Sequence, residues 1–108
     1  MQKKYNVKLT TPAIKWIETF LMKQQVTPIQ IEEINKIYRV IESLEFMPYR
    51  IKVVEDELWE EKEIRKIQAG KYYIYFFIDA HLEEVNVVGF AHSKSNQALE
   101  IKHIHSDL

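Results

Sequence analysis

One stretch of the chain, residues 71–78, does most to limit the folds that the sequence allows. Its letters are KYYIYFFI, so seven of the eight residues are tyrosine, isoleucine or phenylalanine. Such residues favour strands, in which alternate side chains point to opposite faces of a sheet. Tyr73 and Tyr75 would share one face and Tyr72 would take the other. We expect most of this cluster to lie in the core.

Three further segments are predicted to form strands. Residues 63–68 alternate and are separated from the central run by the turn signal Ala69-Gly70. Residues 84–91 follow a turn at 79–81 and carry several large apolar residues. Near the start of the chain, residues 5–10 alternate in part and predict a first strand.

Two helices are predicted between the first strand and the others, because threonine followed by proline marks a helix start twice. Thr11-Pro12 begins a helix that fades near Gln25, and Thr27-Pro28 begins one that ends near Phe46, before Pro48. The first helix repeats apolar residues at Ile14, Ile17, Phe20 and Leu21. The second carries a stripe that we expect to be buried against the sheet: Ile34, Ile37, Tyr38, Ile41 and Leu44.

The order of these elements predicts an α+β fold, with a helical hairpin packed on one face of a mainly antiparallel sheet. The first strand can enter the sheet as a neighbour of the later strands. Residues 49–61 are irregular and charged, and a short C-terminal helix is expected over 96–103. At 108 residues, the chain is predicted to be a single domain over residues 1–108.

Composition narrows the classes of function. Hydrophobic residues make up 46% of the chain and charged residues 29% with balanced signs, which favours a folded core over disorder. Cysteine is absent, which excludes disulfides and fits a reducing cytoplasm. No stretch resembles a signal peptide or reaches the roughly 20 apolar residues of a membrane span. The net charge is −1 and the pI about 6.4, so any role with nucleic acid requires a local basic patch.

A series of short motifs in the second half of the chain resembles a known group of proteins. In order they are Leu58-Trp59-Glu60, Glu63-Ile64-Arg65, residues 70–77, Val88-Gly89-Phe90 and Glu100-Ile101. Together they are similar to the RelE/ParE superfamily of toxins, and most of all to its phage-derived, HigB-like branch. The helical first half agrees in order and length, so the resemblance covers nearly the whole chain.

Three features depart from the pattern of that family. Tyr73 stands where the family usually has arginine. Residues 91–94, Ala-His-Ser-Lys, stand where the family has paired lysines. The motifs at 58–60 and 63–65 cannot both align with one strand motif of the family unless residues are inserted. Each departure removes positive charge from the expected active surface.

The resemblance implies the toxin of a type II toxin–antitoxin module. Such a toxin would be an mRNA interferase, an endoribonuclease that cuts mRNA on translating ribosomes, uses no cofactor and is neutralised by a cognate antitoxin. A homodimer or a toxin–antitoxin hetero-oligomer would be its assembly in the cytoplasm, without membrane contact. Two alternatives stay open. A non-enzymatic ParE-like inhibitor would bind DNA gyrase, which the acidic pI favours, and a phage or plasmid relative would have lost toxicity.

Three residues are expected to carry the reaction. In the ribonuclease members the 2′-OH attacks the adjacent phosphate, which requires a cation at the phosphate oxygens and groups that accept and donate protons. Arg65 matches the family's strand arginine and suits a phosphate through its planar fork. His92, at the end of the last strand, is the candidate acid–base group. Tyr73 is expected to line the site. The plainer interpretations are a solvated arginine paired with Glu63 or Glu84, and a histidine that faces water.

Three lysines are expected to bind the substrate. Lys94 would hold the RNA backbone, and Lys66 and Lys71 would extend the basic patch on either side of the turn at 69–70. A lone surface charge is the plainer interpretation of Lys94. No metal site is expected, because the pattern His103, His105 and Asp107 lies at the end of the chain without a fixed third ligand and is interpreted as a solvated tail.

Overall fold

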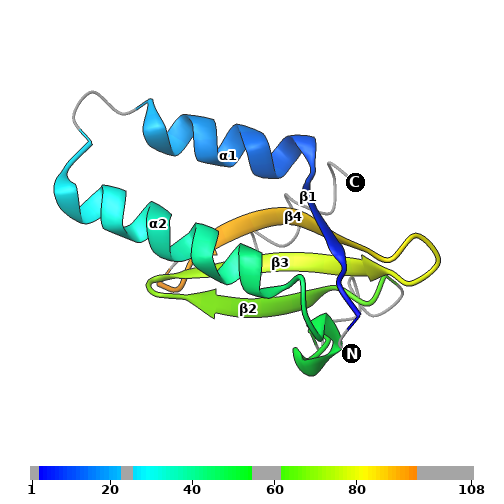
Figure 1. Ribbon diagram of the computed structural model, residues 1–108. Coiled ribbons are helices and arrows are strands. Elements are labelled where there is room, and N and C mark those ends of the chain that lie inside the picture. Colours follow the sequence, from blue (N-terminus) through cyan, green and yellow to red (C-terminus); the bar gives the residue numbers. More distant parts are fainter. Residues whose placement is uncertain (1–2, 23–25, 55–61, 95–108) are drawn as a thin grey trace.

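The computed structural model describes residues 3–22, 26–54 and 62–94 (Figure 1). Its elements are β1 (Asn6–Leu9), α1 (Thr11–Leu21), α2 (Pro28–Ser43), the 3-10 helix η1 (Pro48–Arg50), β2 (Arg65–Ala69), β3 (Tyr72–Asp79) and β4 (Glu84–His92). The predicted helix at 96–103 and the motifs at 58–60 and 100–101 lie outside the described residues.

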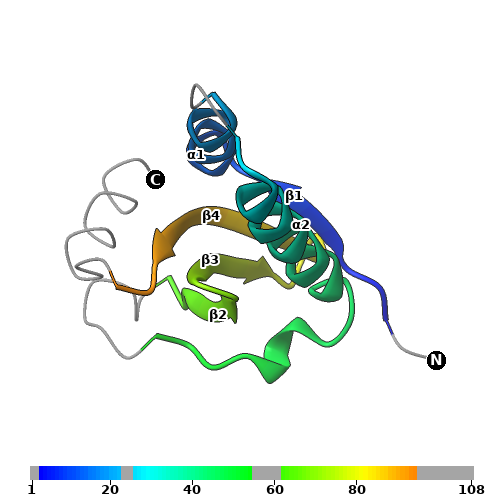
Figure 2. The same ribbon diagram turned by 90° about the vertical axis from the view of Figure 1, so that its left-hand side faces the viewer.

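The four strands form one sheet in the order β1-β4-β3-β2. β1 runs parallel to β4, and the other neighbours are antiparallel. Both helices cover the same face of this sheet, as the turned view makes plain (Figure 2). The predicted α+β architecture is confirmed, including the entry of the first strand beside the last one.

The two helix starts follow the threonine–proline signals in different ways. Thr27 caps α2 through a capping box: its hydroxyl accepts from the backbone of Gln30, whose side chain accepts from the Thr27 backbone. The cap of α1 is Thr10 rather than the predicted Thr11, and its hydroxyl donates instead to the carbonyl of Val87 at 2.9 Å. Thr10 therefore ties the start of α1 to β4.

A core fills the space between the helices and the sheet. Alternate residues of β3 point into it, together with one face of each helix, as expected for a strand in a covered sheet. Its buried members are Ala13, Ile17, Phe20, Ile34, Ile37, Ile41, Leu44, Ala69, Ile74, Phe76, Val85, Val87 and Phe90. The other residues of β3 join a smaller cluster on the opposite face of the sheet, where Ile64, Tyr75, Val88 and Ala91 are buried. The predicted split of the three tyrosines between the two faces is confirmed.

The sequence prediction of the two apolar helix stripes was wrong in two details. Tyr38 is 39% exposed, whereas the other four members of its stripe are buried. One residue corresponds to 100° around a helix, so Tyr38 is turned away from Ile37 toward α1. In α1 the inner face is formed by Ala13, Ile17 and Phe20, and Ile14 and Leu21 are more than two-fifths exposed.

A bulge in β4 changes which of its side chains face the helices. Tyr75 pairs with Gly89, but the next residue, Phe76, pairs with Val87, so Val88 is an extra residue on β4. Strict alternation from Val87 would place Phe90 on the open face. The extra residue brings Phe90 into the core under the helices instead.

Strand β2 begins later than the sequence predicted. Glu63 has a φ of 51°, which lies in the left-handed region, so it cannot continue a strand toward residue 62. The strand runs from Arg65 to the turn before β3, where Gly70 has a φ of 62°. Glycine adopts this conformation without the steric cost that a Cβ adds.

Replacement of Ile41 by alanine tests the packing of α2 against the sheet. Ile41 is 7% exposed, so the truncation should lower the free energy of unfolding by about 2–5 kcal/mol, the usual range for large-to-small core changes. Chemical denaturation would measure the change. Ile29→Ala is the matched control on the same helix, because Ile29 is 66% exposed and should change stability by less than about 0.5 kcal/mol. Equal effects of the two substitutions would contradict the packing described above.

Candidate functional site

Polar and aromatic side chains from β2 and β3 meet on the face of the sheet that lies away from the helices. The ammonium nitrogen of Lys66 lies 4.4 Å from the centre of the Tyr73 ring, within the range of a cation–π contact. Gln68 pairs directly with Tyr73 across the two strands and is exposed. Two of the predicted site residues, Lys66 and Tyr73, are therefore in direct contact on this face.

Arg65 is held by the backbone of the segment that follows α2. Its guanidinium donates to the carbonyl of Ile51 and, at 3.5 Å, to that of Tyr49. Its central carbon also lies 5.1 Å from the centre of the Tyr49 ring. The register of β2 pairs Arg65 with Phe76, which places it on the helix-facing side, away from Lys66. The structure gives Arg65 a definite role in fixing residues 49–51.

His92 lies at the end of β4 on the same side of the sheet as the helices. Its ring meets Tyr72 edge-on, with 5.2 Å between ring centres. The backbone N–H of Lys94 donates to His92 Nδ1 at 3.0 Å. When the imidazole is neutral, this bond leaves the hydrogen on Nε2, so that Nε2 donates a hydrogen bond rather than accepts one.

The other two predicted lysines lie near the same end of the sheet. Lys71 forms an ion pair with Glu33 of α2 at 3.7 Å, and its carbonyl accepts from the backbone of Ser93 at 2.8 Å. Lys94 is exposed just beyond β4. Glu33 also accepts from the Tyr72 hydroxyl at 3.5 Å, and burial together with this carboxylate raises the pKa of Tyr72. Tyr72 therefore stays protonated at neutral pH and is not a general base.

The six predicted site residues do not form one constellation. Across the three strands, Arg65 pairs with Phe76, which pairs with Val87. In the same way, Ala69 pairs with Tyr72, which pairs with His92. Four residues along a strand and two strand spacings separate their backbones, which is roughly 16 Å. Tyr73 and His92 are closer, because Tyr73 pairs with Ala91, the residue before His92. Their side chains, however, leave opposite faces of the sheet.

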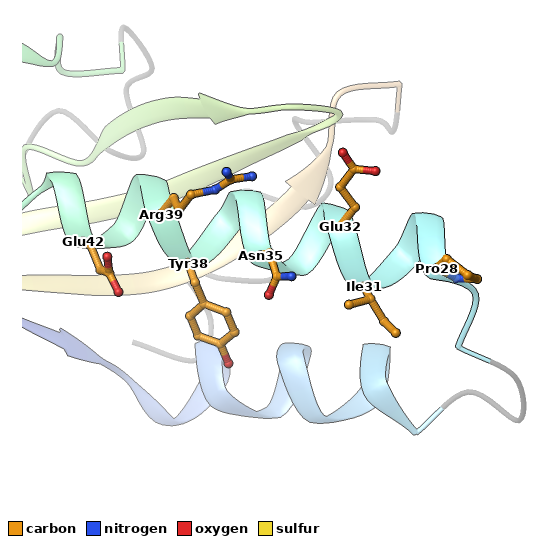
Figure 3. Close-up of a pocket in the computed structure, with 7 residues that line it drawn as sticks. All are labelled: Pro28, Ile31, Glu32, Asn35, Tyr38, Arg39 and Glu42. Carbon is orange, nitrogen blue, oxygen red and sulfur yellow. The ribbon is translucent and has the colours of Figure 1, made fainter.

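A groove along the helical hairpin is a separate feature. It holds about 600 Å³, and Figure 3 shows that Ile31, Asn35 and Tyr38 point from α2 toward α1. Its lining is Pro28, Ile31, Glu32, Asn35, Tyr38, Arg39 and Glu42. Ile14 and Leu21, the exposed apolar residues of α1, are seven positions apart and so share one face of that helix. The hairpin thus leaves apolar side chains of both helices uncovered.

No His, Cys, Asp or Glu cluster suited to a metal ion occurs in the part of the chain that the structure describes. His103, His105 and Asp107 lie outside it. Within the same described ranges, no helix is long and apolar enough to span a membrane.

Sequence comparison finds no matching family model and no matching curated protein. Comparison of structures does find a chain of similar fold. One chain in the crystal structure of the toxin–antitoxin complex RelBE2 from Mycobacterium tuberculosis superposes with a TM-score of 0.62. The match covers 82% of this chain and 91% of that chain, at 21% sequence identity. The protein has a RelE-like fold.

A RelE-like fold confirms the architecture that the sequence motifs implied, whereas the HigB-like branch stays a prediction. Sequence reasoning missed two aromatic residues, Tyr5 and Tyr49, whose rings meet edge-on with 6.1 Å between centres. Burial and the neighbouring Tyr5 raise the pKa of Tyr49. No local signal marks this pair in the sequence, because the two tyrosines lie far apart in the chain and meet only in the folded structure.

Replacement of Arg65 by alanine tests its role as a clamp on residues 49–51. Two backbone carbonyls would lose their donor and Tyr49 would lose its cationic neighbour, so the free energy of unfolding should fall by about 1–3 kcal/mol. Thermal and chemical denaturation would measure this. Arg39→Ala, at an exposed position on α2, is the matched control and should stay within about 0.5 kcal/mol of the wild type. A stable Arg65→Ala protein would show that the clamp is unimportant.

Proposed function

We propose that this chain is the toxin of a type II toxin–antitoxin module and that it cleaves mRNA on translating ribosomes in the cytoplasm. The observation that carries the proposal is the likeness of fold to a chain of a toxin–antitoxin complex over 82% of the sequence. The order of the sequence motifs at 63–65, 70–77 and 88–90 supports it independently. The finer placement in a HigB-like branch rests on those motifs alone.

The contact between Lys66 and Tyr73 would bind the RNA. A half-buried tyrosine can stack on an unpaired base with the part of its ring that Lys66 does not cover, and the lysine beside it can hold the neighbouring phosphate. The two residues sit on the face that the helices leave open, and they belong to adjacent strands that hold them in register. Tyr73 therefore takes over, by stacking, the place at which the family uses the charge of arginine.

The remaining residues lie on the helix-covered side of the sheet or just beyond β4, so they would act on RNA that passes around the end of β4 from this contact. His92, with its hydrogen on Nε2, would donate a hydrogen bond to the leaving 5′-oxygen, and it would transfer a proton only as the imidazolium, after Nδ1 has lost its bond from the Lys94 backbone. Lys94 and Lys71 would guide the RNA backbone past the end of β4. Arg65 would contact the phosphate only after it leaves the carbonyls of Tyr49 and Ile51, which costs about 1–3 kcal/mol. We therefore assign more of the binding to Lys66 than to Arg65.

Growth arrest and mRNA cleavage test the activity. Wild-type protein expressed without an antitoxin should stop growth and create new mRNA ends in translating extracts. Lys66→Ala should lower cleavage by roughly 100-fold to 1000-fold, the usual loss for one transition-state charge contact, and Arg65→Ala should lower it by less, because Arg65 is held by two backbone carbonyls. His92→Gln should lose less, and Lys94→Ala should act through salt-sensitive binding.

Lys15→Ala is the control, because Lys15 is an exposed lysine on α1, far from the open face. The unfolding curve of each variant separates lost chemistry from lost folding, above all for Arg65→Ala. Wild-type arrest without new mRNA ends would contradict the nuclease. If the wild type does neither, Tyr73→Arg is expected to restore activity by returning the family's positive charge.

Inhibition of DNA gyrase is the second candidate. The observation in its favour is the small number of cations available to bind RNA. The net charge is −1. Of the expected cations, Arg65 already donates to backbone carbonyls and Lys71 is paired with Glu33. This function would need no cleavage chemistry. Arrest with inhibited DNA supercoiling and intact mRNA would support it in place of the nuclease.

The antitoxin would dock in the groove of the helical hairpin. Such partners are commonly disordered until bound and can then wrap a large surface, which would let one chain reach from the groove to the open face. Exposed apolar side chains on both helices provide the first contact. The neighbouring reading frame is the place to look for this partner.

Two isoleucines on α2 form a matched pair for this test. Ile31 is 50% exposed and lines the groove, whereas Ile29 is 66% exposed and lies outside it. With the product of the neighbouring reading frame as the probe, Ile31→Ser should weaken binding roughly tenfold. Ile29→Ser should leave binding within about twofold of the wild type, by isothermal titration. The same loss from both variants, or from neither, would place the antitoxin elsewhere.

A further inference from the structure

A compact apolar surface lies at the connection between α2 and β2, at the opposite end of α2 from the hairpin turn (Figure 1). Phe46, Met47 and Tyr49 are 42%, 58% and 48% exposed, although phenylalanine and methionine are usually buried. We call Phe46, Met47, Tyr49, Arg50 and Lys52 the 46–52 surface. It lies apart from the hairpin groove and from the Lys66–Tyr73 contact, so neither of those sites explains it.

Two arginines hold this segment in place. Arg50 donates to the carbonyls of Phe46 and Met47 at 2.7 and 3.1 Å and to the hydroxyl of Ser43 at 3.2 Å. Arg65 donates to the carbonyls of Tyr49 and Ile51 from the other side. The exposed side chains are therefore presented on a fixed backbone, which lowers the entropy lost when a partner binds.

Met47 has an unusual backbone conformation for its residue type. Its φ is 49° and its ψ is 50°, in the left-handed region, where asparagine and glycine are favoured and a residue such as methionine is strained. A surface turn with no other role would gain stability from asparagine at this position. A large apolar side chain at a strained and exposed position is understandable if that side chain contacts a partner.

Among the described residues, the charges around the surface are mostly positive, although the whole chain is slightly acidic. Arg50 and Lys52 belong to it, Arg65 lies beneath Tyr49, and Lys4 is bridged to Phe46 through the backbone. Within the described ranges, the nearby carboxylates are Glu45, which pairs with Lys4, and Glu63, whose charge helps to raise the pKa of Tyr49. An apolar centre with a cationic rim favours a partner with an apolar centre and an acidic rim.

We propose that the 46–52 surface binds an acidic protein segment whose central apolar side chains cover Met47 and Phe46. Carboxylates on either side of that apolar centre would lie near Lys52 and the guanidinium of Arg50. The proposal does not depend on whether the chain is a toxin.

Single-stranded RNA fits the surface less well. Arg50 and Arg65 already donate to backbone carbonyls, so fewer of their N–H groups are available for phosphates. Met47, the most exposed of the three large apolar side chains, offers apolar contact and flexible packing rather than a hydrogen bond or a ring for a base to stack on. A protein segment can use both the apolar contact of Met47 and the positive charge around it.

Fluorescent peptides can test this assignment on the full chain. One peptide carries a central Phe-Leu pair flanked by glutamates, and its twin carries the same pair flanked by lysines. The acidic peptide should bind, and the basic twin should bind at least about tenfold more weakly. Anisotropy at low and high salt would measure both. Equal binding of the twins would overturn the role of charge.

Met47→Asn removes the apolar contact and suits the left-handed backbone, so the variant should fold at least as well as the wild type. It should weaken the acidic peptide about tenfold, as for loss of one central interface side chain. Met22→Asn is the matched control, since Met22 is 81% exposed on the far end of α1, and it should leave binding unchanged. Lys52→Glu should weaken binding, whereas Lys15→Glu, with the same change in net charge, should not.

Three results would overturn the proposal. The first is equal loss, or no loss, in Met47→Asn and Met22→Asn. The second is a dimer of the wild type in sedimentation analysis that Met47→Asn converts to a monomer, because the occupant would then be a second copy of this chain. The third is displacement of the acidic peptide by a single-stranded oligoribonucleotide in the wild type but not in Lys52→Glu, which would make the surface a nucleic-acid site.

Discussion

The burial of β3 on both of its faces is the constraint on which the other elements depend. One set of its alternate side chains, Ile74 and Phe76 among them, requires the two helices as a cover. The other set includes Tyr75, which is buried on the opposite face with Ile64 and Val88. A strand of this kind must lie inside a sheet, so β4 and β2 flank it and β1 is left to the outer edge of β4.

The architecture could be predicted because its signals are local. The strand run at 71–78, the threonine–proline helix starts and the turn at Gly70 each act over a few residues, and each appears in the structure. The errors concern single residues, namely the residue that caps α1 and the direction in which a helix side chain points. Thr10 takes the cap of α1 because β4 offers its hydroxyl an acceptor, whereas Tyr38 leaves the core because it lies one residue around α2 from the buried Ile37.

The candidate site could be predicted only in part, for a similar reason. Lys66 and Tyr73 lie on adjacent strands in simple register, so their contact follows from alternation once the strands pair. His92 does not follow from alternation. Alternation counted from Val87 would put the His92 side chain on the open face with Tyr73. The extra residue Val88 reverses the alternation after it, so His92 lies on the helix-facing side beside Tyr72. Arg65 likewise meets carbonyls of a segment that is not regular enough to be placed from sequence.

The parallel pairing of β1 with β4 has a consequence for how the molecule is made. Asn6 pairs with Glu84 and Leu9 with Val87, so the earliest strand to leave the ribosome has no place in the sheet until the last described strand has been synthesised. Contacts so distant in sequence slow folding, because a long loop must close before they form. Until then α1 lacks the anchor that Thr10 finds on β4. A nascent chain that stops before residue 84 therefore has the helices and the β2–β3 hairpin, but it lacks β4. Without β4 the sheet is incomplete, and β1 has no neighbour with which to pair.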